Sequence, residues 1–179
     1  MSNKVEIIMH PVRMKICQAL MRNKENGLTP REMVKVIKDV PQATLYRHIQ
    51  IMMDAGIIHV INEKKVKSVS EKYYALNEEV ARIDTEEWKK ASYDEKLNYF
   101  SSYQLLLMTQ YQSFLKKLGE QDGQEDRSSF SVVELKLDEE HFIQFQNELN
   151  ELMTKYYHST SNEKDALVRT IAVTIIPET

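Results

Sequence analysis

The stretch PQATLYRHIQIMMDAGII, residues 41–58, places side chains that can read nucleic acid on one predicted helix. An α-helix fits the major groove, where Arg can bridge guanine acceptors, Gln can bridge adenine, and Ala or a Thr methyl can touch the thymine methyl group. Leu45, Ile49 and Met52 are spaced as one apolar stripe, so the remaining side chains should project away from a core. The predicted DNA-contacting residues of this helix are Gln42, Ala43, Thr44, Tyr46, Arg47 and Gln50.

Two further groups are suited to the phosphate backbone. The sequence TPRE predicts a helix start with Thr29 as N-cap and Glu32 closing a capping box. Arg31 and the exposed amide groups at this helix end could bind phosphate. After the reading helix, a predicted hairpin has a basic tip with Lys64, Lys65 and Lys67, which could also grip the backbone. The alternative for this tip is an ordinary solvated turn.

The histidines and the cysteine do not form a pattern of metal ligands. Cys17 is the only cysteine, and the five His residues show no ligand spacing. The run Asp138–His141 resembles a ligand group but is better explained as a helix N-terminus, where acidic residues are favoured. His48 lies beside the apolar stripe and is more often a structural residue in such a place. We therefore predict no metal and no cofactor.

The surrounding pattern predicts an α+β chain that is mainly α. A winged helix-turn-helix over 1–77 should be followed by a dimerisation or effector region over 78–179. Helices are expected at about 11–23, from Thr29, and at about 42–55, 85–90, 93–118 and 138–158. Strands are expected at 57–62, 68–76, 130–137 and 167–176.

Charge is distributed unevenly along the chain. Residues 1–76 hold 13 Lys/Arg against 7 Asp/Glu, a net +6, whereas residues 77–179 hold 11 against 20, a net −9. A basic half joined to an acidic half suggests an anion-binding module on a solubilising scaffold. No apolar run approaches the ~20 residues of a membrane span, and no secretory signal is evident. A cytoplasmic protein is expected.

The segments HPVRMKICQAL, LTPREMVKVIKDVPQATLYRHIQIMMDAGIIHVI and EKYYAL together resemble the winged helix-turn-helix of ArsR-like transcriptional regulators. The resemblance covers about residues 7–76. It implies a dimeric regulator that binds a pseudo-palindromic operator, usually as a repressor. The lone Cys17 departs from the metal-sensing branch of that family. PadR-like winged helices, which also carry a long C-terminal helix, are the alternative family.

The predicted long helix carries a heptad seam, with the spacing typical of a coiled coil. Its members are Leu97, Phe100, Gln104, Leu107, Tyr111, Phe114 and Leu118. The seam could pack within its own subunit. We favour pairing across a two-fold axis, with Leu97, Phe100, Leu107, Tyr111 and Phe114 in the homodimer interface. The strand-helix-strand that follows could enclose a pocket for a small-molecule effector or form a solid core.

Three functions compete at this stage. The leading hypothesis is a sequence-specific regulator that binds double-stranded DNA. The second is a winged-helix module that binds proteins without reading DNA. The third is an enzyme with an appended winged helix, and against it no glycine-rich nucleotide-binding, nucleophile-elbow or zinc-protease motif occurs. We therefore do not expect an enzyme.

Overall fold

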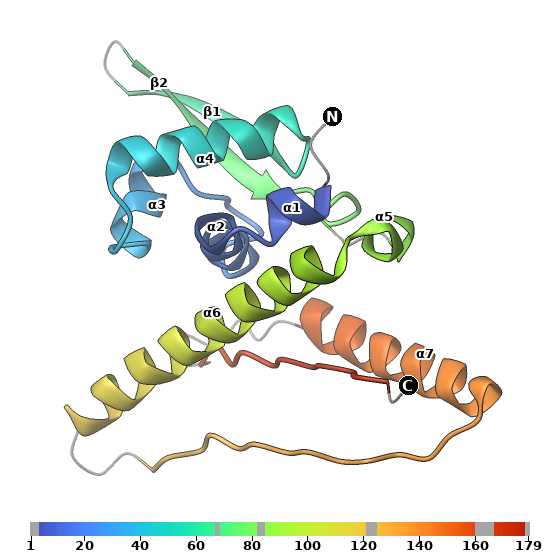
Figure 1. Ribbon diagram of the computed structural model, residues 1–179. Coiled ribbons are helices and arrows are strands. Elements are labelled where there is room, and N and C mark those ends of the chain that lie inside the picture. The colour runs from blue at the N-terminus through green and yellow to red at the C-terminus, as the bar shows by residue number, and fades with distance from the viewer. Residues whose placement is uncertain (1–3, 67–68, 82–84, 121–124, 160–166, 178–179) are drawn as a thin grey trace. The chain divides into compact units, whose positions relative to one another are not determined.

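The computed structural model describes residues 4–66, 69–81, 85–120, 125–159 and 167–177 (Figure 1). The chain divides into two compact units, residues 1–125 and residues 126–179. The first holds α1 (Lys4–Ile8), α2 (Pro11–Met21), α3 (Pro30–Val36), α4 (Gln42–Asp54), β1 (Ile58–Val66), β2 (Val69–Leu76), α5 (Thr85–Lys90) and α6 (Tyr93–Gly119). The second holds α7 (Glu139–His158). The functional boundary drawn at residue 77 stays a prediction.

The order of α2, α3, α4 and the antiparallel β1–β2 hairpin confirms the mainly helical α+β class with a helix-turn-helix at its start. Leu28, just before α3, forms an isolated bridge with Tyr74 of β2, with N–O distances of 3.0 Å and 2.9 Å. This bridge ties the chain that leads into α3 to the hairpin. The core between these elements is built from apolar side chains, the largest of which are Ile16, Leu20, Met33, Leu45, Met52, Ile57 and Ile58.

Local hydrogen bonds set the start of α3 and the end of α4. Thr29 caps α3, and its reciprocal hydrogen bonds with Glu32 confirm the predicted capping box. At the far end of α4, the amide of Ile57 donates to the Met52 carbonyl at 2.9 Å, and that of Gly56 donates to Met53 at 2.9 Å. Gly56 has a φ of 71°, so this end is a Schellman motif that turns the chain directly into β1.

The short helix α1 was not predicted, because five residues carry little periodic signal. Tertiary contacts stabilise it. Arg13 of α2 is buried and donates to the carbonyl oxygens of Ile7 and, at 3.0 Å, of Glu6, so it satisfies the C-terminal carbonyls of α1. Val5 packs in a small cluster with Ala91 and Tyr99, which connects α1 with the start of α6.

The long helix α6 begins one residue after Ser92, which forms a second capping box with Glu95. It is buried through Tyr99 and Leu106, not through the heptad seam. Of the seam, Leu97, Phe100 and Phe114 remain exposed, whereas Leu107 and Tyr111 are half-buried. The side chain of Gln110 donates to Gln18 of α2. The seam therefore lies beside the face of α6 that packs on α1 and α2, and it stays partly open.

In the second unit, Asp138 caps α7, and its carboxylate accepts the His141 amide at 2.9 Å, which confirms the predicted helix start. The flanking segments 130–137 and 167–176, predicted as strands, are extended but belong to no β-ladder among the described residues. In Figure 1 they run in the same direction, connected through α7. The strand-helix-strand order is thus present without a sheet.

Gly27 provides a stability test. Its φ is 63°, and a Cβ there would lie 2.5 Å from the Tyr74 carbonyl oxygen. We expect Gly27→Ala to lower the free energy of unfolding by roughly 2 kcal/mol or more, from left-handed strain plus displacement of the bridge to β2. Urea unfolding followed by circular dichroism measures this change.

Gly56→Ala is the matched control, because its φ is also positive but no atom lies within 4 Å of the added Cβ. It should cost only the backbone strain, about 1 kcal/mol. Equal losses for the two variants would show that the close approach of residue 27 to β2 does not contribute.

Candidate nucleic-acid interface

The candidate interface is the exposed face of α4. Leu45, Ile49 and Met52 point into the core, none of them more than 4% exposed. The opposite side chains, Gln42, Ala43, Tyr46, Arg47 and Gln50, are exposed, as predicted from the helical spacing. Thr44 is half-buried, so it projects less fully than the helical spacing predicted.

Two exposed side chains of α4 have different freedom. No described hydrogen bond fixes the guanidinium of Arg47, which lies one turn before Gln50 and Ile51. The Gln50 amide nitrogen donates to the Asp54 carboxylate at 2.8 Å, which holds that side chain along the helix. Reading a base with both atoms of the Gln50 amide requires this contact to break, whereas Arg47 is ready to bind an anion or a base edge.

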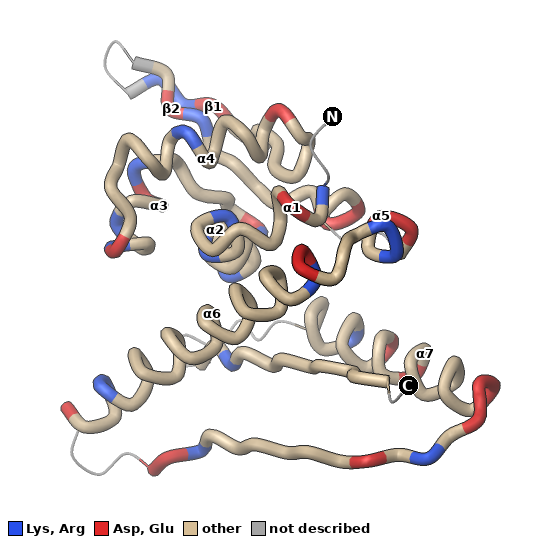
Figure 2. Tube along the Cα trace, viewed as in Figure 1, with Lys and Arg blue, Asp and Glu red and all other residues tan. Residues whose placement is uncertain are grey.

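Basic side chains flank α4 on the neighbouring elements. Figure 2 shows Lys and Arg on α3, α4 and the hairpin. Arg31 is exposed in the first turn of α3, and Lys64 and Lys65 are exposed on β1. The ammonium of Lys64 lies 5.0 Å from the centre of the Tyr73 ring, across the hairpin. Lys67 lies outside the described residues.

The start of α3 already holds an anion of the protein itself. The Glu32 carboxylate accepts the Thr29 amide at 2.8 Å, and the Thr29 hydroxyl accepts the Glu32 amide at 3.2 Å. Hydrogen bonds from the Thr29 amide and the Thr29 hydroxyl to the carboxylate lower the pKa of Glu32, with smaller contributions from Lys35 and Lys64. Phosphate binding at this end therefore depends on Arg31 rather than on those two amides.

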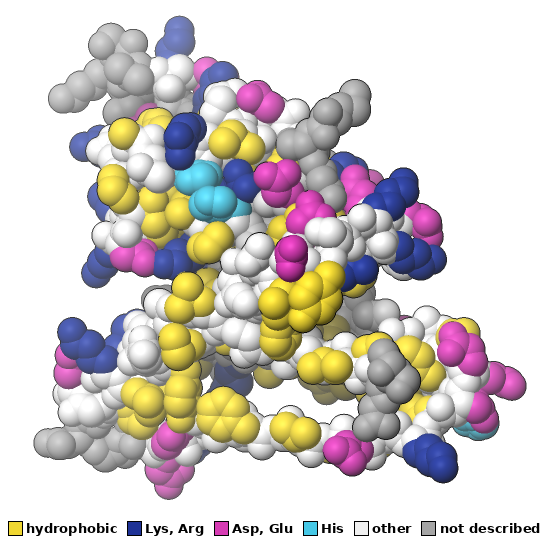
Figure 3. Space-filling view, in the orientation of Figure 1, with side chains coloured by type: hydrophobic (Ala, Val, Ile, Leu, Met, Phe, Trp, Pro, Cys, Tyr) yellow, Lys and Arg dark blue, Asp and Glu magenta, His cyan; other side chains and the backbone are white. Residues whose placement is uncertain are grey.

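His48 lies beneath the exposed face of α4 and is only 4% exposed. Its ring centre lies 4.5 Å from that of His10, whose Nδ1 accepts the Val12 amide and caps α2. The Nδ1 atom of His48 has no hydrogen-bond partner within the described part of the chain. Figure 3 shows histidine side chains, in cyan, next to Lys and Arg side chains on the first unit.

Burial, then the charges of His10, Arg13 and Arg47, lower the pKa of His48 from 6.5 to about 4. Burial, Arg13 and Arg47 also lower the pKa of His10. A neutral His48 leaves Arg47 as the cation on this part of α4 near pH 7. His48 is therefore a packing residue, in agreement with its expected structural role. The contributions of His10 and Arg13 were not foreseen, although a His directly before Pro11 is compatible with a helix cap.

Three other kinds of site were considered from the sequence or the surface: a metal site, a reactive thiol and an effector pocket. Among the described residues, no group of three or more His, Cys, Asp or Glu side chains could hold a metal ion. Cys17 is buried, and burial raises its pKa to about 12, so it is not a reactive thiol. A surface depression on α7 is lined by Glu148, Glu151, Leu152 and Lys155, all from one helix. An enclosed effector pocket stays a prediction.

The His48 ring makes stability depend on pH. Its folded pKa of about 4 lies below the unfolded value of 6.5, so the unfolded chain takes up a proton first as the pH falls. The contribution is complete above about pH 6.5 and is lost as the pH falls toward 4. Between pH 7 and 4.5 we expect this group to lower the free energy of unfolding by roughly 2 kcal/mol.

Urea unfolding of wild type and His48→Leu at the two pH values measures that difference. The variant should lose less stability on acidification than wild type, because Leu has similar volume and no charge. The exposed His59 is the control, and His59→Leu should keep the wild-type pH dependence. Parallel pH curves for wild type and His48→Leu would show that the buried ring does not titrate as described.

The comparison with known proteins agrees with this geometry. Residues 8–61 match the helix-turn-helix domain family, a range that runs from α1 into β1 and contains α2, α3 and α4. No curated protein matches the chain at a significant level. No described helix is long and apolar enough to cross a lipid bilayer. The helix-turn-helix match over residues 8–61 indicates a DNA-binding regulator.

Proposed function

We propose that this chain is an ArsR-like, sequence-specific transcriptional repressor that acts as a homodimer on a pseudo-palindromic operator in the cytoplasm. The observation that carries the proposal is the two-sided α4. Its apolar stripe is buried, while Arg47 and its exposed neighbours face solvent. The protein binds and does not catalyse.

In this proposal α4 enters the major groove with its N-terminal half. Arg47 bridges the O6 and N7 acceptors of guanine, and Gln42 and Ala43 contact the bases reached by the leading end. Tyr46, which is 43% exposed, contacts the sugar-phosphate edge or a base methyl beside Arg47. Gln50 reads a base after exchanging its bond with Asp54.

The neighbouring elements hold the phosphate backbone. Arg31 of α3 and the hairpin residues Lys64 and Lys65 are exposed cations. Phosphate contacts of this kind position the recognition helix but carry little sequence information, and they make affinity depend on salt. Glu63 and Glu71 lie on the same hairpin, opposite Lys72 and Lys64 in its register. Lys65, which lies nearer the tip, is opposite the uncharged Ser70.

The homodimer is proposed to form along α6. Leu97, Phe100 and Phe114 are 49%, 38% and 37% exposed, although they belong to one heptad seam. A 27-residue helix spans about 40 Å, comparable to the ~34 Å between half-sites one helical turn apart. Two copies joined along this helix could therefore present two α4 helices to one operator.

Two substitutions separate base reading from phosphate binding. Arg47→Ala should lose about 1–3 kcal/mol on the cognate site and relax base preference at one position. Lys65→Ala should weaken all DNA nearly equally and lower the magnitude of the salt slope by about 1. Fluorescence anisotropy with cognate and scrambled duplexes at several salt concentrations measures both effects.

The control is Lys117→Ala, which removes an exposed cation from the last turn of α6, and it should bind like wild type. If all three variants bind DNA alike, the assigned face is wrong. An absence of salt-dependent DNA affinity in the wild type would favour the protein-interaction module.

A charge in the seam tests the dimer. Phe100→Glu would place a carboxylate in the apolar contact, and we expect the dimer dissociation constant to rise at least about tenfold. Asn98→Glu adds the same charge at an exposed position two residues away and should leave the association unchanged. Analytical ultracentrifugation measures both. Equal association of the two variants would exclude the seam as the interface.

A further inference from the structure

The second unit leaves two strand-like segments without a sheet. Residues 130–137 and 167–177 are extended, yet neither belongs to a β-ladder within the described residues. Within residues 133–137 of the first segment apolar and charged residues alternate, and Val133, Leu135 and Leu137 share one face. These three side chains are 69%, 55% and 42% exposed. Keeping such a segment extended costs conformational entropy that a ladder and a covered apolar face would offset.

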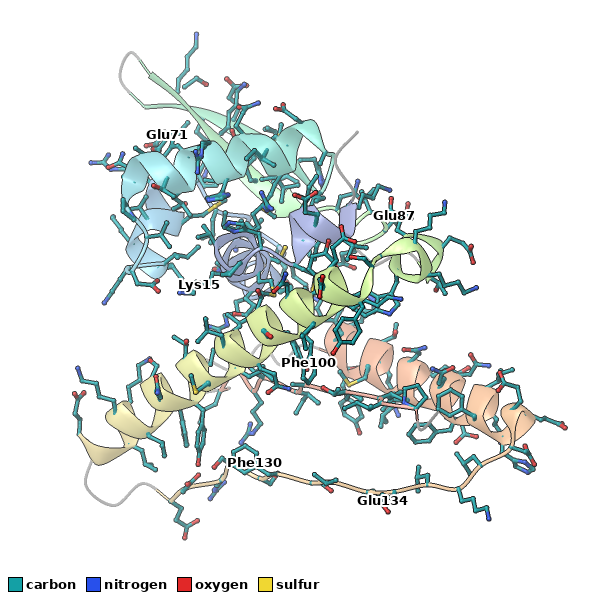
Figure 4. All side chains as sticks on the ribbon, viewed as in Figure 1. Lys15, Glu71, Glu87, Phe100, Phe130 and Glu134 are labelled. Atoms are coloured by element: carbon teal, nitrogen blue, oxygen red, sulfur yellow. The ribbon has the colours of Figure 1, made fainter. Side chains whose placement is uncertain are left out.

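The charges of this segment make it complementary to itself. Glu134 and Lys136 are both on the face opposite Val133, Leu135 and Leu137, on either side of Leu135. Figure 4 shows Glu134 projecting outward from the segment. A second copy running antiparallel would bring Glu134 opposite the Lys136 of its partner, and the reverse, if the two-fold axis passes through Leu135. Opposite charges directly across two strands stabilise their pairing.

Other registers lack this match. An axis at Glu134 would place Glu134 opposite itself, and an axis at Lys136 would place two lysines together, which is destabilising. A shift by one residue would turn charged side chains onto the apolar face. Only the register centred on Leu135 among these pairs both charges and keeps Val133 opposite Leu137.

We propose that residues 133–137 are a second homodimer contact, in which this strand pairs antiparallel with the same strand of another copy about a two-fold axis at Leu135. The second copy is favoured as occupant because the charge pattern is complementary to its own reverse. The segment 167–177 is less informative, since Arg169 is its one charged residue. This contact does not depend on DNA binding, so its test uses the full chain without DNA.

A cysteine at the axis gives a local readout. In Leu135→Cys, the two new thiols face each other in the dimer, with Cβ atoms close enough for a disulfide after small adjustment. Mild oxidation of the full-length protein should produce a covalent dimer on a non-reducing gel. The wild type is the blank because Cys17 is buried. Ile176→Cys, an exposed position on the other segment, is the matched control and should cross-link far more slowly.

Charge reversal in the Leu135→Cys background tests the register. Glu134→Lys alone and Lys136→Glu alone each replace two opposite-charge pairs by two like-charge pairs, so each should slow cross-linking about tenfold at low salt. The double variant Glu134→Lys with Lys136→Glu restores both pairs and should cross-link within about twofold of its parent. All three substituted positions are exposed, so the folded units should be unaffected.

The proposal is overturned if Leu135→Cys fails to cross-link, if Ile176→Cys cross-links as fast, or if the double charge variant is slower than either single one. Each result leaves the proposed DNA binding untouched, because Arg47 and the hairpin lie in the other unit. Conversely, loss of DNA binding in Arg47→Ala with unchanged cross-linking would separate the two functions.

Discussion

The burial of one stripe of α4 is the constraint on which the candidate interface depends. Leu45, Ile49 and Met52 fix the rotation of the helix about its own axis, because an apolar stripe this deeply covered has few alternative packings. Once that rotation is set, Arg47 and Gln50 must face solvent. The packing of α4 that buries its apolar stripe therefore also determines which side chains form the candidate interface.

The ends of α4 complete the positioning. Pro41 directly precedes the helix and disfavours helical geometry at Val40, so the chain between α3 and α4 is not helical. At the other end, Gly56 reverses the chain and delivers Ile57 and Ile58 to the core, so that β1 leaves beside the helix. The placement of the hairpin beside α4 thus depends on the left-handed conformation of Gly56, which only glycine adopts without strain.

Arg13, His10 and His48 lie close together on the inner side of α4. Arg13 closes the end of α1. Burial, together with the charges of Arg13 and Arg47, lowers the pKa of His10 and His48. The uncharged rings can then pack against each other without repelling the arginine above them. The exposed charge of Arg47 is in this way compatible with a well-packed interior, and Arg13 also holds α1 in place.

Much of this architecture was predictable from the sequence, because its signals are local. The Thr29–Glu32 capping box, the stripe of α4, the Ser92–Glu95 cap of α6 and the Asp138 cap of α7 each need only a few neighbouring residues, and each is present in the structure. The exposed face of α4 followed from the same periodicity. Half-buried Thr44 shows the limit of that inference, since a helical wheel gives direction but not the height of neighbouring side chains.

Tertiary structure alone decided which of several apolar faces is used. In α6 the heptad seam and the stripe of Tyr99 and Leu106 are both largely apolar. Only the elements that pack against α6 decide that Tyr99 and Leu106 are the buried residues. The same holds for α1, which exists through Arg13, and for 130–137, whose strand pattern has no ladder among the described residues. Sequence determined helix ends, turn residues and the two sides of α4, because these depend on neighbours in the chain. Partner choice depends on residues far apart, so it required the folded molecule.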